Sequence, residues 1–428
     1  MKTIKYPDKK DWKKLTQRPV AEQQELSELV NSIFGEVKKD GDKAIFKYNL
    51  LFDKTDSKQL VVNNNAVKEA TEKVSKELQK AIKTARKNIG KFHAAQKESK
   101  KVIETTKGVK CWRESRAIER VGIYIPGGSA PLFSTVLMLG IPAKIAGCKE
   151  IILCTPPDKN GAINPAILFT ANLIGIRKIY TVGGIQAIGA MTFGTKTVPK
   201  VDKLFGPGNQ YVTAAKQVAQ NYGVAIDMPA GPSEVLIIAD RSCKPEFVAA
   251  DLLSQAEHGA DSQVILLSDD LEIVYDTLME VAKQLANLPR KEIATKALNN
   301  SKGITLKNIE ECIAFSNEYA PEHLILAVKN YNKFISKISN AGSVFLGNYS
   351  CESAGDYASG TNHTLPTNGY ARNYSGVSLD SFLKKISFQE LSKDGIRNIG
   401  HTVELMAEAE QLTAHKNAVT VRLNSLKK

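Results

Sequence analysis

Short runs that are apolar at almost every position alternate with helical stretches from about residue 121 onward, and this alternation constrains the fold most strongly. Such runs are typical of parallel strands whose two faces are both covered by helices. The intervening stretches, about 10–20 residues long, have helical periodicity. The pattern therefore predicts an α/β fold with doubly wound parallel sheets. The predicted strands are Val121–Ile125, Glu150–Cys154, Lys178–Val182, Val201–Phe205, Glu234–Ala239, Gln263–Leu267, Leu324–Val328 and Ser343–Leu346.

A turn-rich segment, PAGPSE at 229–234, separates the first four predicted strands from the last four. Eight strands can form one large sheet or two, and this break favours two α/β domains, over 121–232 and 233–375. A mostly helical region over 1–120 precedes them, and part of it is expected to pack on the second domain. A helical tail over 376–428 is expected to pack on a partner subunit. Helices are predicted over 20–38, 42–52 and 65–93, and as short segments within 379–424.

The net charge of +13 suggests a nucleic-acid partner, but its placement argues against one. Residues 1–110 hold 26 Lys and Arg against 15 Asp and Glu, so +11 of the +13 lies there. The lysines are interleaved with glutamates along helical patterns, which is typical of a solvated helix face. The rest of the chain is almost neutral and lacks the aromatic motifs that stack on RNA bases. We therefore expect no nucleic-acid partner.

The sequence predicts neither a membrane protein nor a secreted one. The longest apolar candidate, Ala130–Ala143, ends at Lys144 and is shorter than the roughly 18 residues that a spanning helix needs. The N-terminal residues lack the apolar core of a signal peptide. Six cysteines, none in a CxxC pair, are too few in so long a chain for a disulfide framework. We expect a cytoplasmic protein with reduced thiols and no membrane partner.

Three segments bring titratable or metal-binding residue types together. Gln255 and His258 stand three residues apart at the end of a predicted helix, so an amide oxygen and an imidazole can face one cation. The alternative is a histidine that interacts with the helix dipole before a glycine cap. Glu322 and His323 enter a predicted strand and suit acid–base catalysis, provided that the backbone bends. A surface acid beside a half-buried histidine is the alternative there.

The third segment is the long Gly- and Ser-rich stretch after the last predicted strand, which contains Glu352, Asp356 and His363. Loops of this length usually serve a function. Asp356 can be an oxygen ligand for a cation or can simply form an Asx turn. Glu410 and His415, near the C-terminus, indicate nothing on their own.

Glycine-rich turns follow three predicted strands, at 125–131, 182–190 and 206–216. Backbone N–H groups at such strand-to-helix turns can hold phosphate groups. None of the turns matches the GxGxxG fingerprint, so a classical dinucleotide-binding mode is not predicted. GxSxG, P-loop and HExxH motifs are also absent from the sequence. Cys148 and Cys154 flank a predicted strand and are expected in the core, so neither is a persuasive nucleophile.

Eight segments, in order over about 300 residues, together resemble the histidinol dehydrogenase family. The resemblance implies incomplete Rossmann-like domains and the final steps of L-histidine biosynthesis, in which L-histidinol is oxidised through bound L-histidinal to L-histidine. Two NAD molecules would accept hydrides in turn. A homodimer with active sites shared between subunits and one Zn²⁺ per subunit is also implied. The segments are YIPGGSAPLFSTVLML (124–139), GPGNQYVTAAK (206–216), DMPAGPSEVLIIAD (227–240), DLLSQAEHGADSQV (251–264), YAPEHL (319–324), AGSVFLG (341–347), ESAGDYASGTNHTLPT (352–367) and LTAHKNAVTVR (412–422).

The resemblance further implies roles for single residues. His323 would be the general base for alcohol oxidation, and Glu322 would activate water for aldehyde oxidation. The zinc ligands would be Gln255, His258, Asp356 and His415. The substrate would contact Ser233, Gln255, His258, His323, Asp356, Glu410 and His415, with His363 also lining the pocket. NAD would contact Tyr124, Gln186 and Asn209.

In the family the C-terminal segment reaches the other subunit's site, so Glu410 and His415 would act in trans. Cys351 departs from the family pattern, which usually has proline just before Glu352. Its thiol can lie near the metal or can be a tolerated loop substitution.

A zinc-dependent hydrolase using Glu322 or Glu257 is an alternative function. It explains the metal ligands but not the three glycine-rich turns.

Overall fold

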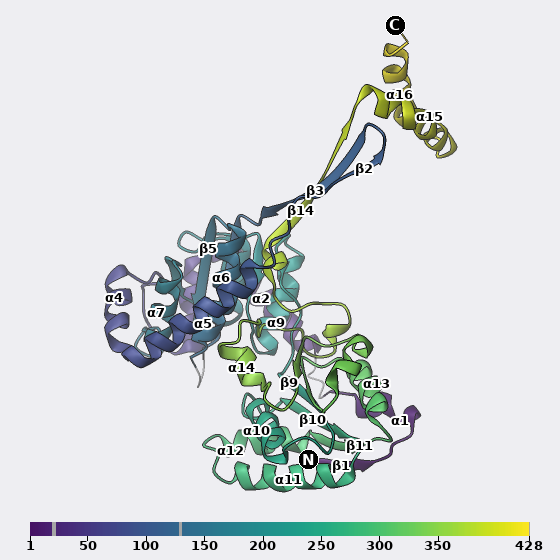
Figure 1. Ribbon diagram of the computed structural model, residues 1–428. Coiled ribbons are helices and arrows are strands. Elements are labelled where there is room, and N and C mark those ends of the chain that lie inside the picture. The colour runs from purple at the N-terminus through teal and green to yellow at the C-terminus, as the bar shows by residue number, and fades with distance from the viewer. Residues whose placement is uncertain (19–22, 128–130, 428) are drawn as a thin grey trace.

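The computed structural model describes residues 1–18, 23–127 and 131–427 (Figure 1). Two parallel sheets form the body of the molecule, which confirms the predicted α/β fold. The start of the helix predicted over 20–38 and the middle of the glycine-rich turn predicted over 125–131 lie outside the described residues.

The first sheet has five parallel strands in the order β6-β5-β4-β7-β8. Chain order reverses at β4, and ligands bind doubly wound sheets at such switch points, beyond the carboxyl ends of the strands. None of the described helices is long and apolar enough to cross a membrane. The elements are β4 (Arg120–Tyr124), α6 (Phe133–Ala146), β5 (Glu150–Thr155), α7 (Pro165–Leu173), β6 (Lys178–Thr181), α8 (Gly184–Phe193), β7 (Lys203–Phe205), α9 (Gln210–Gln220) and β8 (Ala225–Ile226).

The second sheet has six parallel strands in the order β1-β11-β10-β9-β12-β13. Every residue of β9, β10 and β12 is buried, because helices cover both faces of the sheet. The elements are β9 (Glu234–Ala239), α10 (Pro245–Ala256), β10 (Gln263–Ser268), α11 (Leu271–Leu285), α12 (Lys291–Asn299), β11 (Lys302–Thr305), α13 (Ile309–Tyr319), β12 (His323–Ala327), β13 (Ser343–Leu346) and α14 (Glu352–Tyr357). Short 3₁₀ helices lie at Tyr331–Lys333, Ile335–Lys337, Tyr370–Arg372 and Leu379–Phe382.

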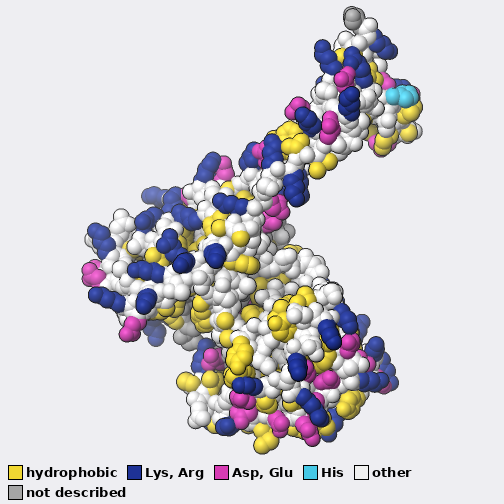
Figure 2. Space-filling view, viewed as in Figure 1, with side chains coloured by type: hydrophobic (Ala, Val, Ile, Leu, Met, Phe, Trp, Pro, Cys, Tyr) yellow, Lys and Arg dark blue, Asp and Glu magenta, His cyan; other side chains and the backbone are white. Residues whose placement is uncertain are grey.

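The N-terminal region divides between the two sheets. Strand β1 (Lys2–Lys5) extends the second sheet by pairing with β11, and α1 (Lys9–Leu15) packs on α13. Strand β1 was not predicted, because its four residues, two of them lysines, form a strand only by pairing with β11. The remaining helices pack on the first sheet, and lysine and arginine side chains gather over this part of the surface (Figure 2). They are α2 (Gln23–Asp40), α3 (Asp42–Tyr48), a π-helical turn (Asn49–Asp53), α4 (Asn64–Lys73) and α5 (Lys76–Ala94).

A three-stranded antiparallel arm projects from the body and carries two helices at its end (Figure 1). The prediction of short helices over 379–424 is wrong for Leu383–Leu391, which forms β14. This strand depends on distant partners: it pairs with β3 along its whole length, and Phe388 stacks on Trp112 with ring centroids 5.6 Å apart. The rest of the tail is helical, as expected. The elements are β2 (Val102–Thr106), β3 (Val109–Ala117), β14, α15 (Lys393–Ala409) and α16 (Thr413–Ser425).

Candidate active site

Glu322 and His323 lie at the amino end of β12, beside the start of β9 in the centre of the second sheet. Both side chains are buried, with exposed fractions of 8% and 4%. The chain bends at Glu322, just after Ala320 adopts a positive φ of 54°. The bend brings Glu322 Oε2 within 3.6 Å of His323 Nδ1, so two consecutive side chains face one site. The backbone bend that acid–base catalysis by this pair requires is therefore present.

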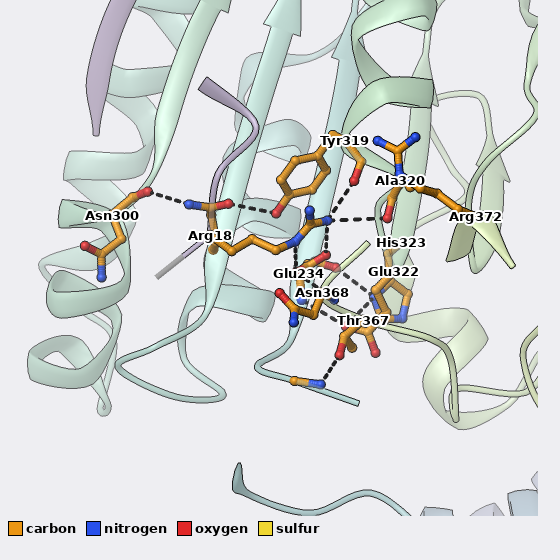
Figure 3. Close-up of polar contacts among 12 residues, drawn as sticks. Arg18, Glu234, Asn300, Tyr319, Ala320, Glu322, His323, Thr367, Asn368 and Arg372 are labelled. Atoms are coloured by element: carbon orange, nitrogen blue, oxygen red, sulfur yellow. Dashed lines mark hydrogen bonds and ion pairs between the residues drawn. The ribbon is translucent and has the colours of Figure 1, made fainter. Parts of the chain in front are cut away.

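The backbone of Glu234 holds both side chains (Figure 3). Its N–H donates to Glu322 Oε2 at 2.9 Å, and its carbonyl lies 3.1 Å from His323 Nδ1. A carbonyl can only accept, so this contact places the ring proton on Nδ1 and leaves the Nε2 lone pair available in the neutral imidazole. The amide nitrogen of Gln255 lies 3.4 Å from both Glu322 Oε2 and His323 Nδ1.

A candidate metal site adjoins this pair. His258, Glu352 and Asp356 each offer one ligand atom, and these atoms lie within 4.8 Å of one another. Within the described part of the chain, four buried polar atoms here have no hydrogen-bond partner: Gln255 Oε1, His323 Nε2, Glu352 Oε2 and Asp356 Oδ1. Two of them, His323 Nε2 and Asp356 Oδ1, lie 3.6 Å apart, within ion-pair distance. Leaving such atoms unpaired is costly, so their convergence indicates a site built for a ligand. A donor set of nitrogen and oxygen without thiolate fits Zn²⁺ or Mn²⁺.

Burial strongly shifts the acid–base properties of this cluster. It raises the pKa of Glu322 to about 8 and that of Glu352 to about 8. Burial alone would lower the pKa of His323, but the carboxylates of Glu352, Glu322 and Asp356 raise it well above its ordinary value. Burial opposes ionisation of Asp356, yet His323, His363 and His258 hold the pKa of that carboxyl below its usual range. Groups tuned in this way can exchange protons near neutral pH.

Glu352 is the member of the cluster to which sequence analysis gave no role. It stands four residues before Asp356, and helix α14 places both on one face. That spacing was a usable signal, but the surrounding Gly- and Ser-rich sequence suggested a loop. Cys351 occupies the N-cap of α14 with a φ of −72°, a value that proline also adopts, so the backbone accepts either residue.

His363 connects this cluster with the first sheet. Its Nδ1 lies 2.9 Å from the carbonyl oxygen of Asp356, and its Nε2 lies 2.9 Å from Thr135 Oγ1 on α6. Burial lowers the pKa of His363, so the ring favours its neutral form. Helix α6 follows β4, so this contact brings the carboxyl edge of the first sheet close to the acid–base pair.

Tyr124, Gln186 and Asn209 mark the carboxyl edge of the first sheet. The N–H of Gly184 donates to the Tyr124 hydroxyl at 3.0 Å, which joins the turns after β4 and β6. Asn209 caps α9 by accepting from the N–H groups of Tyr211 and Val212. Gln186 is fully buried: its Nε2 donates to Asn49 and Asp53, and its Oε1 has no hydrogen-bond partner among the described residues.

The turn after β7 is held rigidly. Gly206 has a φ of 136°, and a Cβ there would lie 2.1 Å from the carbonyl oxygen of Tyr124, so only glycine fits. Lys216 is buried, forms an ion pair with Asp227 and donates to the carbonyl of Gly206 at 2.8 Å. The start of the turn after β7 is therefore packed closely against the end of β4.

Three predicted substrate contacts lie outside the cluster. Ser233 precedes β9, and its carbonyl accepts from the N–H of Gln263 at 3.2 Å. Glu410, directly after α15, and His415, on α16, are exposed and lie at the end of the arm, far from the acid–base pair of the same chain (Figure 1). One chain alone does not bring these two residues to the site.

Comparisons with known proteins agree over almost the whole chain. The model of the histidinol dehydrogenase family matches residues 16–423. A histidinol dehydrogenase of Bacteroides thetaiotaomicron is 57% identical over 427 residues, covering 100% of both chains. The crystal structure of histidinol dehydrogenase from Elizabethkingia anophelis is 66% identical, with a TM-score of 0.99 over 100% of this chain and 99% of that one. An acetylating aldehyde dehydrogenase from Geobacillus thermoglucosidasius, 14% identical with a TM-score of 0.51 over 89% of this chain and 94% of that one, shares the fold alone.

The raised pKa of Glu322 predicts a pH-dependent effect of the substitution Glu322→Gln on stability in chelator-treated protein. Below pH 4.5 the Glu322 carboxyl is protonated in both the folded and the unfolded protein. Between pH 4.5 and about 8 it is ionised only in the unfolded protein. The free energy of unfolding therefore falls by up to about 1.4 kcal/mol per pH unit through this group. Glutamine removes this loss, so the variant should gain stability over the wild type between pH 5.5 and 7.5 in urea titrations.

The substitution Glu292→Gln, at an exposed position on α12, is the matched control and should show the same difference from the wild type at every pH. A Glu322→Gln difference that does not change with pH would contradict the prediction.

Proposed function

The chain belongs to the histidinol dehydrogenase family, a family of oxidoreductases in histidine biosynthesis, and from this premise we propose its reaction. It oxidises L-histidinol through bound L-histidinal to L-histidine, with NAD as oxidant and Zn²⁺ in the substrate site. The observation that carries this proposal is the Glu322–His323 pair, which the backbone of Glu234 holds in place. Beside the pair lie buried nitrogen and oxygen atoms that have no hydrogen-bond partner among the described residues. A zinc hydrolase would use the same donors, but the family assignment disfavours it.

Gln255, His258 and Asp356 would hold the zinc ion, together with His415 from a second copy of the chain. Gln255 Oε1 and Asp356 Oδ1 have no hydrogen-bond partner among the described residues, and this supports the assignment. When bound, zinc would hold the imidazole and amino groups of the substrate, and NAD would accept one hydride in each oxidation. Tyr124, Gln186 and Asn209 would contact NAD at the carboxyl edge of the first sheet, a usual place for such a ligand.

His323 would be the base in the first oxidation. The hydrogen bond from Nδ1 to the carbonyl of Glu234 supports Nε2 as the accepting atom. Nε2 takes the hydroxyl proton of L-histidinol while the carbon loses a hydride, and the alcohol becomes an aldehyde. The nearby carboxylates raise the pKa of His323 and so favour the imidazolium. The positive charge of bound zinc would oppose this effect and favour the neutral imidazole, which is the form that can accept a proton.

Glu322 would be the base in the second oxidation. Burial raises its pKa to about 8, so its ionised carboxylate is a stronger base than that of an exposed glutamate, and bound zinc nearby would favour that ionised form. It removes a proton from water as the water oxygen attacks the aldehyde carbon, and the resulting hydrate loses the second hydride. The sequence offers no cysteine suited to form a thiohemiacetal, so water is the nucleophile.

A homodimer would complete each site. Glu410 and His415 lie on an arm that extends away from the body of its own chain (Figure 1). Leu405 and Met406 on α15 are 54% and 61% exposed, which supports packing of this helix on a second copy. All six cysteines are free thiols, which suits a reducing compartment such as the cytoplasm.

The two bases predict separable defects. The substitution His323→Asn should slow oxidation of L-histidinol by about 10²–10⁴-fold and slow oxidation of L-histidinal less. Glu322→Gln should have the larger effect on L-histidinal, because activation of water is lost. Both rates are measured as NADH formation from each substrate, with Glu292→Gln as a control that retains wild-type rates. Equal loss of both oxidations in both variants would contradict this division of roles.

Sharing of sites between subunits predicts complementation. Homodimers with His258→Ala or with His415→Ala should both be inactive. A heterodimer of one chain of each kind, isolated with two affinity tags, should regain one intact site and about half of the wild-type activity per dimer. An inactive heterodimer would show that both ligands of a site come from one chain.

A further inference from the structure

A buried ion pair links the N-terminal segment to the acid–base pair. The side chains of Arg18 and Glu234 are 14% and 2% exposed. Arg18 Nε lies 2.5 Å from Glu234 Oε1, and Arg18 Nη2 lies 2.9 Å from Oε2, so the guanidinium binds both carboxylate oxygens (Figure 3). Such bidentate pairs fix orientation as well as charge.

The same guanidinium holds the turn that leads to Glu322 and His323. It donates to the carbonyl of Tyr319 at 2.8 Å and to that of Ala320 at 3.4 Å. It also lies over the Tyr319 ring, 3.9 Å from the centroid. Arg18 therefore joins the first residue of β9 to the residue with positive φ whose conformation allows the bend at Glu322.

Glu234 is the point at which these contacts meet. Its carboxylate also accepts from the backbone N–H of Asn368 at 3.0 Å, while its own N–H and carbonyl bind Glu322 and His323. A shift of this one residue would move both side chains that carry the proposed proton transfers.

We propose that Arg18 is a positioning residue that acts through Glu234 to orient Glu322 and His323. This inference rests on the proposed function, since the reaction assigns those two residues as bases. Arg18 touches neither of them, so it sets their geometry and takes no part in proton transfer. Small errors in the placement of reacting groups cost rate steeply, and about 10²-fold is typical of a displacement near 1 Å.

The substitution Arg18→Met tests this role. It removes the charge and all four hydrogen bonds but keeps an apolar chain over the Tyr319 ring. We expect kcat for both L-histidinol and L-histidinal to fall by about 10²-fold, with a much smaller change in KM. Dilute guanidinium chloride should restore part of kcat to an Arg18→Ala variant, because it can replace the missing group.

Arg372→Met is the matched control. Arg372, in the 3₁₀ helix Tyr370–Arg372, donates to the carbonyl of Glu318, one residue before Tyr319, and Figure 3 shows it beside Ala320. No contact between Arg372 and Glu234 is present among the described residues, so this variant should retain the wild-type kcat. Melting temperature and zinc content are measured for every variant, and kcat is expressed per folded, zinc-loaded site.

A double-substitution series separates positioning from a general structural role. If Arg18 acts through the two bases, Arg18→Met should add little to the defect of His323→Asn in L-histidinol oxidation or of Glu322→Gln in L-histidinal oxidation. Fully additive defects, or a normal kcat per folded site in Arg18→Met, would overturn the inference. A wild-type protein that fails to oxidise L-histidinol would instead contradict the proposed function, which distinguishes the two failures.

Discussion

The site depends on the hydrogen bonds between the backbone of Glu234 and the side chains of Glu322 and His323. One N–H and one carbonyl, at the first residue of β9, hold Glu322 and His323 in fixed orientations. Strand β9 lies between β10 and β12 and is buried along its whole length, so this support is part of the core of the sheet. A site on the end of a central strand is more rigid than one on a free loop. The ion pair with Arg18 fixes the carboxylate of the same residue.

The two sheets contribute opposite edges to the site. The first sheet presents carboxyl ends, where Gly206 packs against the backbone of Tyr124. The second presents amino ends, where the bend at Glu322 places an acid beside an imidazole. The contact of Thr135 with His363 joins the edges. Beside the acid–base pair, oxygens of Gln255, Glu352 and Asp356 have no hydrogen-bond partner among the described residues.

The local sequence pattern predicted those features that depend on neighbouring residues in the chain. The buried strands were visible because both faces are apolar, and Gln255, His258, Glu322, His323 and Asp356 stood out by spacing or by family resemblance. Residues that depend on distant partners were missed. Strand β14 exists through β3, and β1 through β11. Nothing near Arg18 in the sequence indicates Glu234, which lies 216 positions away. Glu352 was obscured by loop-like neighbours, although its spacing from Asp356 was a helical one.

We propose that Gln255, His258 and Asp356, with His415 from a second copy of the chain, hold Zn²⁺ and substrate for two successive oxidations by NAD. The most direct test is the number of NADH molecules formed per L-histidinol by the purified protein, before chelation, after it and after zinc is returned. We predict two NADH per L-histidinol, loss of turnover with the chelator and recovery with zinc. A folded, zinc-loaded dimer that forms no NADH from L-histidinol would contradict the claim and direct attention to hydrolysis at the same site.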